Sequence, residues 1–424
     1  MTSTSRQGAE PILLAFSGGL DTSFCVPWLK DTYQRPVITV TVDTGGIDAA
    51  AARSLAERSV QLGAIEHHLI DARAAYFEQV LKYLLMGNVR RGGVYPLCVG
   101  AERVLQAQTI AQMALSLKTK MVAHGCTAAG NDQVRFEVAL RTLAPELEIV
   151  APVRDRAFQR PEQLKYLQDN RLPIPPFGAA YSVNRGLWGV TIGGKETLTS
   201  EGSIPDDAWV LSKDAFSAPR AAERHVIAFE QGVPVGLDGT ALSAVAIIEK
   251  LEELAGPFGI GRGIHLGDTV IGTKGRVAFE APAADVLLTA HRELEKLVLT
   301  GKQARIKDSV AQPYGDLVHE GQHLDPVCRD IEALLLSSQA RVSGDVRVLF
   351  RPGSVFVEGV TSPYSLMAAS KGVYGESAGE WTPADALGYS RMLALTGVFY
   401  KRAGVNQALR ASTAAAATGQ AHEP

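Results

Sequence analysis

The sequence predicts an α/β protein in which a parallel, doubly wound domain is followed by an α+β domain and a C-terminal helix. Short apolar strands and helical segments alternate through residue 151, which is the pattern of a parallel sheet. Pro-Ile-Pro-Pro at 173–176 then indicates a linker, beyond which strands punctuated by Gly and Pro dominate. A chain of 424 residues also exceeds one ordinary hydrophobic core. We therefore expect domains at 1–165 and 166–380, and a terminal helix with a frayed tail at 381–424.

Five apolar or β-branched runs predict the strands of the first domain. The run Pro-Val-Ile-Thr-Val-Thr-Val is the clearest, because β-branched residues favour strands. Segments with a helical pattern separate most of these runs. The predicted strands are 11–16, 36–42, 66–70, 121–124 and 147–151, and the predicted helices are 22–31, 49–62, 75–85 and 101–117.

Two hairpins predict the second domain. Residues 225–229 and 233–237 form the first, and 346–350 and 354–358 form the second, which turns at Arg-Pro-Gly. Helices are expected at 243–255, 285–298 and 383–402, and the Ala/Thr/Gly-rich residues 411–424 are expected to fray.

The composition indicates a folded cytoplasmic protein that binds neither nucleic acid nor membrane. Charged residues make up 21% and the net charge is −3, without the basic stripe of a nucleic-acid binder. The four cysteines are scattered, which argues against a disulfide framework or a zinc site. No apolar run reaches the roughly 18 residues that span a bilayer, and the polar N-terminus, Met1 to Glu10, lacks an apolar signal core.

The loop after the first predicted strand has the features of a phosphate site. Two glycines in Ser17-Gly18-Gly19-Leu20-Asp21-Thr22-Ser23 let the backbone approach a ligand closely. The N–H groups and dipole of the next helix point at the same spot, and three hydroxyls add donors. The carboxylate at position 21 is placed to cap the helix or to help hold Mg²⁺. The run is neither a Walker A loop nor a dinucleotide fingerprint; the alternative is an ordinary strand–turn–helix junction.

A second loop, His124 to Glu137, follows the fourth predicted strand at the edge of the sheet where open α/β folds bind ligands. Asn131 and Arg135, at i and i+4, share a helix face. An arginine offers a bidentate fork to a carboxylate, and Asp132 can accept from an ammonium group. The loop therefore suits a zwitterionic amino acid. The alternative is a helix start with Asn and Asp caps and a surface ion pair at the arginine; the strand-end histidine is either structural or a proton shuttle.

Both loops resemble the signatures of one enzyme family. The first is similar to Ser-Gly-Gly-x-Asp-Ser/Thr of N-type ATP pyrophosphatases, which cleave ATP between the α and β phosphates. The second is similar to His-Gly-x-Thr-x-x-Gly-Asn-Asp-x-x-Arg-Phe-Glu of argininosuccinate synthases, and the weaker segments resemble a divergent bacterial subgroup. The resemblance implies an ATP- and Mg²⁺-dependent ligase of arginine biosynthesis that joins citrulline to aspartate, in a homotetramer held by its C-terminal helix.

The resemblance also implies the roles of individual residues. Asp21, Asp132 and Arg135 would be catalytic, and Asp21 would also hold the metal. ATP would be bound by Ala15, Phe16, Ser17, Gly18, Gly19, Leu20, Asp21, Thr22, Ser23, Val42 and Gly125. The amino-acid substrates would be bound by Tyr95, Thr127, Asn131, Asp132, Arg135, Ser182, Thr191 and Asp268.

The chain departs from the family pattern mainly on the citrulline side. Val99 and Gly100 replace a pair of hydroxyl residues after Tyr95, Gly267 replaces a glutamate and Phe279 replaces a tyrosine. Smaller changes put Thr191 in place of a serine and Val42 in place of an alanine. The neighbouring Asp268 is placed to compensate for the glutamate. Citrulline is the leading substrate, while a modified citrulline or another ureido compound stays open.

Two further alternatives stay open at the level of function. One is another adenylating enzyme of the superfamily, such as a tRNA thiolase or an amidotransferase synthetase domain, although the missing Cys-x-x-Cys and N-terminal catalytic cysteine argue against both. The other is a non-catalytic nucleotide-binding protein, against which the intact loop around Asn131 argues.

Overall fold

The computed structural model describes residues 10–176, 181–376 and 378–419. The chain divides into two compact units after Tyr364. The expectations for residues 1–9 and for the end of the tail, 420–424, lie outside the described residues. The division expected near residue 165 stays a prediction.

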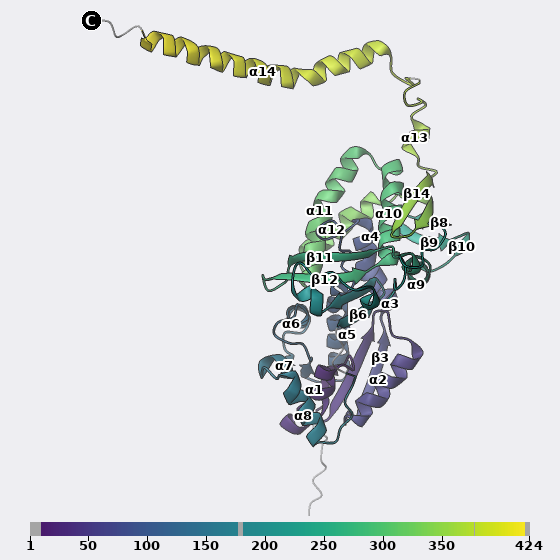
Figure 1. The fold of residues 1–424 in the computed structure, drawn as a ribbon, viewed down its shortest axis with the longest axis vertical. Coiled ribbons are helices and arrows are strands. Elements are labelled where there is room, and N and C mark those ends of the chain that lie inside the picture. Colours follow the sequence, from purple (N-terminus) through teal and green to yellow (C-terminus); the bar gives the residue numbers. More distant parts are fainter. Residues whose placement is uncertain (1–9, 177–180, 377, 420–424) are drawn as a thin grey trace, which may run out of the picture. The chain divides into compact units, whose positions relative to one another are not determined.

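A five-stranded parallel sheet forms the start of the first unit (Figure 1). The strand order is β3-β2-β1-β4-β5, and every neighbouring pair is parallel. The winding reverses between β1 and β4, and such a reversal opens a ligand crevice at the carboxyl ends of the two strands. The predicted parallel, doubly wound sheet is confirmed. Its strands are β1 (Ile12–Ala15), β2 (Val37–Asp43), β3 (Glu66–Asp71), β4 (Met121–Ala123) and β5 (Glu148–Val150).

Helices cover both faces of this sheet because its central strand is apolar on both sides. Leu13 belongs to one core cluster, whereas Ile12 and Leu14 belong to the other. The helices are α1 (Leu20–Tyr33), α2 (Ala49–Gln61), α3 (Arg73–Tyr76), α4 (Lys82–Met86), α5 (Arg103–Ser116), α6 (Asp132–Leu143), α7 (Pro152–Asp155) and α8 (Arg160–Asp169).

Two antiparallel sheets follow in the same unit. One has the order β11-β12-β7-β6 and the other β10-β9-β8-β13-β14, so both predicted hairpins are confirmed. The first sheet contains β6 (Ser182–Gly186), β7 (Gly189–Gly193), β11 (Arg262–Asp268) and β12 (Lys274–Glu280). The second contains β8 (Glu223–Glu230), β9 (Val233–Leu237), β10 (Thr240–Ala241), β13 (Gly344–Arg351) and β14 (Ser354–Thr361).

Four longer helices accompany these sheets, two of which were not predicted. Helices α9 (Ala244–Ala255) and α10 (Pro282–Val298) match the expected segments. Helices α11 (Gly301–His319) and α12 (Pro326–Ser338) were missed. Pro313 lies inside α11, and a proline normally interrupts a helix; the Thr300–Gln303 capping box at its start was the available signal.

The second unit consists of α13 (Leu366–Ala369) and the long helix α14 (Pro383–Gly419). The tail expected to fray from Ala411 is helical through Gly419, and its fraying stays a prediction. Alanine has the highest helix propensity, and this segment is rich in it. Among the described helices, none is both long and apolar enough to cross a membrane.

Candidate functional site

Two adjoining cavities lie at the carboxyl ends of β1 and β4. The first, of about 550 Å³, is lined by the loop after β1 and by α5. The second, of about 480 Å³, is lined by the loop after β4 and by the β11-β12-β7-β6 sheet. The residues that line both cavities are Asp21, Arg103, Gly125, Cys126, Asp132 and Asn184. A ligand in one cavity therefore lies beside a ligand in the other.

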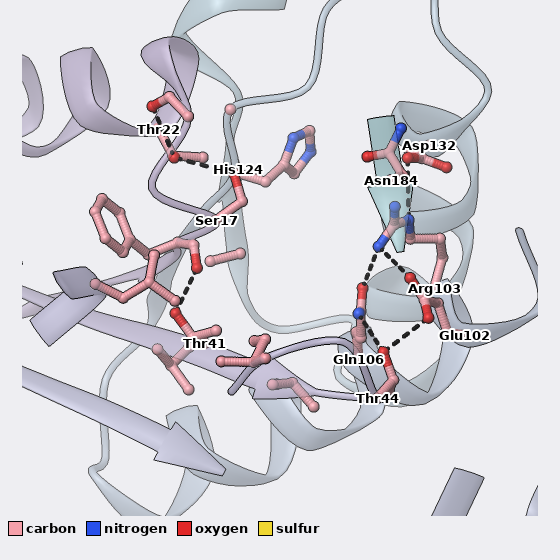
Figure 2. A pocket seen from close by; sticks show the side chains of 18 of the residues that line it. Ser17, Thr22, Thr41, Thr44, Glu102, Arg103, Gln106, His124, Asp132 and Asn184 are labelled. Atoms are coloured by element: carbon pink, nitrogen blue, oxygen red, sulfur yellow. Dashed lines mark hydrogen bonds and ion pairs between the residues drawn. The ribbon is translucent and has the colours of Figure 1, made fainter. Parts of the chain in front are cut away.

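The loop after β1 has the conformation expected of an anion site. Gly18 has a φ of +73° and Gly19 is the N-cap of α1, so the helix starts at once. Ser17 Oγ lies 3.2 Å from Thr22 Oγ1, and both residues line the first cavity (Figure 2). Arg58 donates through Nη1 to the Gly18 carbonyl at 2.7 Å and adds a positive charge to the cavity wall.

Most of the predicted nucleotide residues line this cavity, but three do not. Gly18 shapes the turn, and Leu20 packs against a core cluster. Ser23 is fully buried, and its Oγ donates to the Gly18 carbonyl at 3.5 Å. These three residues support the loop from behind. The predicted residues in the cavity wall are Ala15, Phe16, Ser17, Gly19, Asp21, Thr22, Val42 and Gly125.

Asp21 has a carboxylate that is free to bind a ligand. Within the described chain it accepts no hydrogen bond and forms no ion pair, although it borders both cavities. The described residues contain no group of three or more His, Cys, Asp or Glu that could hold a metal by itself. A single carboxylate beside a phosphate loop nevertheless fits Mg²⁺, which typically takes one or two carboxylates together with substrate phosphates.

A polar cluster that the sequence did not predict forms the opposite wall of the first cavity (Figure 2). Arg103 donates to Glu102 Oε1 at 2.8 Å, to Gln106 at 2.9 Å and to Asp132 Oδ2 at 3.0 Å. Thr44 donates to the other oxygen of Glu102 at 2.8 Å. The cluster holds the Arg103 guanidinium where the two cavities meet. In the sequence, the only sign of this cluster was the adjacent charged pair Glu102-Arg103 at the start of a helix.

Asp132 and Arg135 face each other in the second cavity. Arg135 donates through Nη1 to Asp132 at 2.8 Å and through Nε to the His319 carbonyl at 2.7 Å. Its Nη2 lies 3.2 Å from His319 Nδ1. Burial raises the pKa of Asp132, but Arg103 and Arg135 outweigh it, so the pKa falls below its usual range. Asp132 is therefore a carboxylate near neutral pH.

The alternative for the loop His124 to Glu137 was a helix start with capping side chains and a surface ion pair. It is wrong in two respects. Arg135 is only 5% exposed, so the arginine end of its ion pair with Asp132 is buried. Asn131 is the N-cap residue but makes no side-chain cap, and its Oδ1 accepts from Val270 N at 2.9 Å across the cavity. We expected the guanidinium of Arg135 to be free to bind a substrate carboxylate, but protein groups partly engage it. All eight predicted substrate residues line the second cavity: Tyr95, Thr127, Asn131, Asp132, Arg135, Ser182, Thr191 and Asp268.

Comparison with known proteins matches both halves of the chain to one family. Residues 11–173 match the arginosuccinate synthase N-terminal HUP domain, and residues 181–400 match the arginosuccinate synthase C-terminal domain. The chain belongs to the argininosuccinate synthase family. It is 40% identical over 399 residues to the argininosuccinate synthase of Xanthomonas campestris pv. campestris, covering 92% of this chain and 98% of that protein. It is 35% identical to that of Staphylococcus saprophyticus (94% and 98% covered) and 38% identical to that of Pyrobaculum aerophilum (92% and 97%). The predicted family and its ATP-dependent ligase chemistry are confirmed.

Measured against the family pattern, two glycines of the second cavity have neighbours in the space of a side chain. A Cβ at Gly100 would lie 2.9 Å from Arg135 Nη2, and a Cβ at Gly267 would lie 2.6 Å from His265 Nε2. Phe279 packs beside Tyr95, with ring centroids 5.2 Å apart. Arg135 and His265 thus occupy the space that side chains at positions 100 and 267 would take.

Two further predictions concern Asp268 and His124. Asp268 lines the cavity, but its carboxylate pairs with Lys274. It is therefore less free to replace the family's glutamate than the sequence indicated. His124 is 1% exposed, and its Nδ1 accepts from Cys126 N at 3.3 Å. Its Nε2, however, has no hydrogen-bond partner among the described residues and His124 lines the first cavity, so both readings of that histidine stay open.

Glu102 predicts a specific pH dependence of stability. Burial raises its pKa from 4.5 to about 7, although Arg103 and Thr44 act in the opposite direction. The folded state then binds the proton more tightly than the unfolded state, so this stabilisation is present below about pH 4.5 and is lost as the pH rises through 7. The change corresponds to about 3 kcal/mol. The free energy of unfolding of the unaltered protein, minus that of Glu102→Gln, should fall by about this amount between pH 4.5 and 8.

Urea unfolding at several pH values measures this difference. Glu78→Gln is the matched control, because Glu78 is exposed and, among the described residues, pairs only with Lys82. Parallel stability curves for the unaltered protein and Glu102→Gln would contradict the assignment.

Proposed function

We propose that this chain catalyses the ATP-dependent condensation of L-citrulline with L-aspartate, which yields argininosuccinate, AMP and pyrophosphate. The observation that carries this proposal is the junction of the two cavities. A phosphate loop lines one, the Asp132–Arg135 pair lines the other, and Asp21 and Arg103 stand between them. Such a junction suits the transfer of an adenylyl group to an amino acid.

The first step takes place where the cavities meet. The ureido oxygen of citrulline attacks the α-phosphorus of ATP, and the bond from that phosphorus to the pyrophosphate oxygen breaks. Ser17, Thr22 and the first N–H groups of α1 would bind the departing phosphates. Arg58 and Arg103 would offset the negative charge. Asp21 would hold Mg²⁺, whose role is to neutralise phosphate oxygens.

The second step uses aspartate. Its ammonium first loses a proton to solvent; the resulting amine attacks the ureido carbon, AMP leaves with the former ureido oxygen, and the attacking nitrogen loses a second proton. Asp132 would hold the incoming ammonium, while Thr127 and Asn131 would orient the aspartate. No protein nucleophile is needed, because positioning and charge stabilisation carry the reaction.

A modified citrulline, or another ureido compound, is the second candidate substrate. The observation that favours it is the set of departures at Gly100 and Gly267, which line the second cavity, and at Phe279, which packs beside the cavity residue Tyr95. Phosphate-site features do not distinguish the two candidates, because the departures lie on the amino-acid side.

An omission assay separates these possibilities. The protein is incubated with ATP, Mg²⁺, aspartate and citrulline, and pyrophosphate is followed. Release that requires citrulline supports the proposal. Release only with an acylated citrulline moves the proposal to a modified substrate, and no release with any ureido donor contradicts enzymatic function.

We also propose a cytoplasmic homotetramer that is held together by α14. Apolar side chains along this helix, including Leu393 and Phe399, are exposed in the single chain, which favours burial against other copies. The four free cysteines fit a reducing compartment. A light-scattering mass of one chain would contradict the oligomeric part of this proposal.

A further inference from the structure

Two buried imidazoles in the wall of the second cavity each have an unsatisfied nitrogen. His265, on β11, is 8% exposed and His319, at the end of α11, is 6% exposed. Both line the cavity. Within the described chain, neither Nε2 has a hydrogen-bond partner. A buried polar atom without a partner costs free energy, so an unpartnered nitrogen in a residue that lines a cavity indicates a ligand that satisfies it.

The ring of His265 lies in the space that a side chain at position 267 would take. A Cβ at Gly267 would meet His265 Nε2 at 2.6 Å, and a Cβ at Gly92 would meet Cε1 of the same ring at 3.0 Å. The ring also stacks on Tyr95, with centroids 5.5 Å apart and an interplanar angle of 17°. The two glycines and the tyrosine fix the imidazole beside a predicted substrate residue.

The hydrogen bond between His319 and Arg135 determines where the proton of His319 lies. A guanidinium can only donate, so His319 Nδ1, 3.2 Å from Arg135 Nη2, must be the acceptor. Burial, together with Arg135 and Arg91, lowers the pKa of His319 to about 3, so the ring is neutral at neutral pH. The one hydrogen of the neutral ring must then sit on Nε2. His319 therefore presents an N–H donor for which the described chain supplies no acceptor.

We propose that His265 and His319 are substrate-binding residues of the second cavity, and that the Nε2–H of His319 donates a hydrogen bond to an oxygen of the ureido amino acid. This inference rests on the proposed function and assigns its donor-substrate site. Of the two imidazoles, His265 takes the space that a side chain at Gly267 would fill. Both rings bind an oxygen acceptor without adding charge.

Two substitutions at position 319 separate the roles of the two ring nitrogens. His319→Asn keeps a carbonyl oxygen near the place of Nδ1 as an acceptor for Arg135 but removes the Nε2–H. His319→Gln places an amide N–H near the position of Nε2. We expect His319→Asn to weaken citrulline affinity roughly 3- to 10-fold, as for the loss of one neutral hydrogen bond, and His319→Gln to restore part of it. His265→Phe, which keeps the stacking on Tyr95, should weaken citrulline affinity by a similar factor.

Calorimetric titration of citrulline, in the presence of α,β-methylene-ATP and Mg²⁺, measures these affinities without turnover. His68→Asn is the control, because His68 lies outside both cavities and its side chain is 32% exposed. Pyrophosphate release then gives KM for citrulline and for ATP, and only the former should rise. Unchanged citrulline affinity in both His319→Asn and His265→Phe overturns the inference, as does an equal rise of KM for ATP. If the unaltered protein neither binds nor uses citrulline, the proposed function fails and the inference falls with it.

Discussion

Replacement of Asp132 by asparagine should lower kcat/KM by roughly 10²- to 10³-fold. The carboxylate accepts from Arg103 at 3.0 Å through one oxygen and from Arg135 at 2.8 Å through the other. An asparagine can accept at only one of these positions, and its NH₂ group would face a guanidinium. The substitution therefore disturbs the Arg103 guanidinium at the junction of the cavities. It also removes the carboxylate proposed to hold the aspartate ammonium.

Steady-state pyrophosphate release with all three substrates measures this effect, and circular dichroism checks that the variant folds. Asp169→Asn is the matched control: Asp169 is 60% exposed and pairs with Lys165 on α8, away from both cavities. We expect the control to be active and Asp132→Asn to lose activity mainly through KM for aspartate and through kcat. Activity of Asp132→Asn within threefold of the unaltered protein would refute this role.

Replacement of Gly125 by alanine should raise KM for ATP and lower kcat/KM for ATP by up to about 100-fold, the order expected for a misplacement of about 1 Å. A Cβ at this position would lie 2.8 Å from Thr22 Cγ2 and 3.1 Å from Thr22 N. Because a backbone atom is among these contacts, rotation of a side chain cannot relieve them all. The added methyl must push the first turn of α1, and the phosphate loop with it.

A second substitution tests the steric cause of this loss. Gly125→Ala combined with Thr22→Ser removes the methyl group that the new Cβ meets first and keeps the hydroxyl, so it should recover part of the activity. Gly193→Ala serves as the control, since a Cβ there would have no neighbour within 4 Å. If the double variant is no better than Gly125→Ala, the contact with Thr22 is not the cause.

The parts of the site that lie in contiguous motifs could be predicted from the sequence. The loops Ser17–Ser23 and His124–Arg135 each follow an apolar strand, and the fold brings β1 and β4 side by side. Adjacent parallel strands present their carboxyl ends at one edge, so two separate motifs become one site. The same pattern predicted the doubly wound sheet and both hairpins.

The parts that depend on tertiary contacts could not be predicted in this way. His319 meets Arg135 from 184 positions away, at the end of a helix that was itself missed. Glu102 sits in the sequence beside Arg103 and resembles an ordinary surface pair, yet it is 2% exposed. No local pattern distinguishes a solvated charge from one enclosed by a distant strand, so the polar wall of each cavity became visible only in the structure.

An oxygen-isotope experiment tests the central claim most directly. Citrulline carrying ¹⁸O in its ureido group is converted with ATP, Mg²⁺ and aspartate, and the AMP formed is analysed by mass spectrometry. If the ureido oxygen attacks the α-phosphorus and leaves with it, the ¹⁸O appears in AMP in a one-to-one ratio with argininosuccinate. Argininosuccinate formed together with AMP that contains no ¹⁸O would contradict activation through the ureido oxygen.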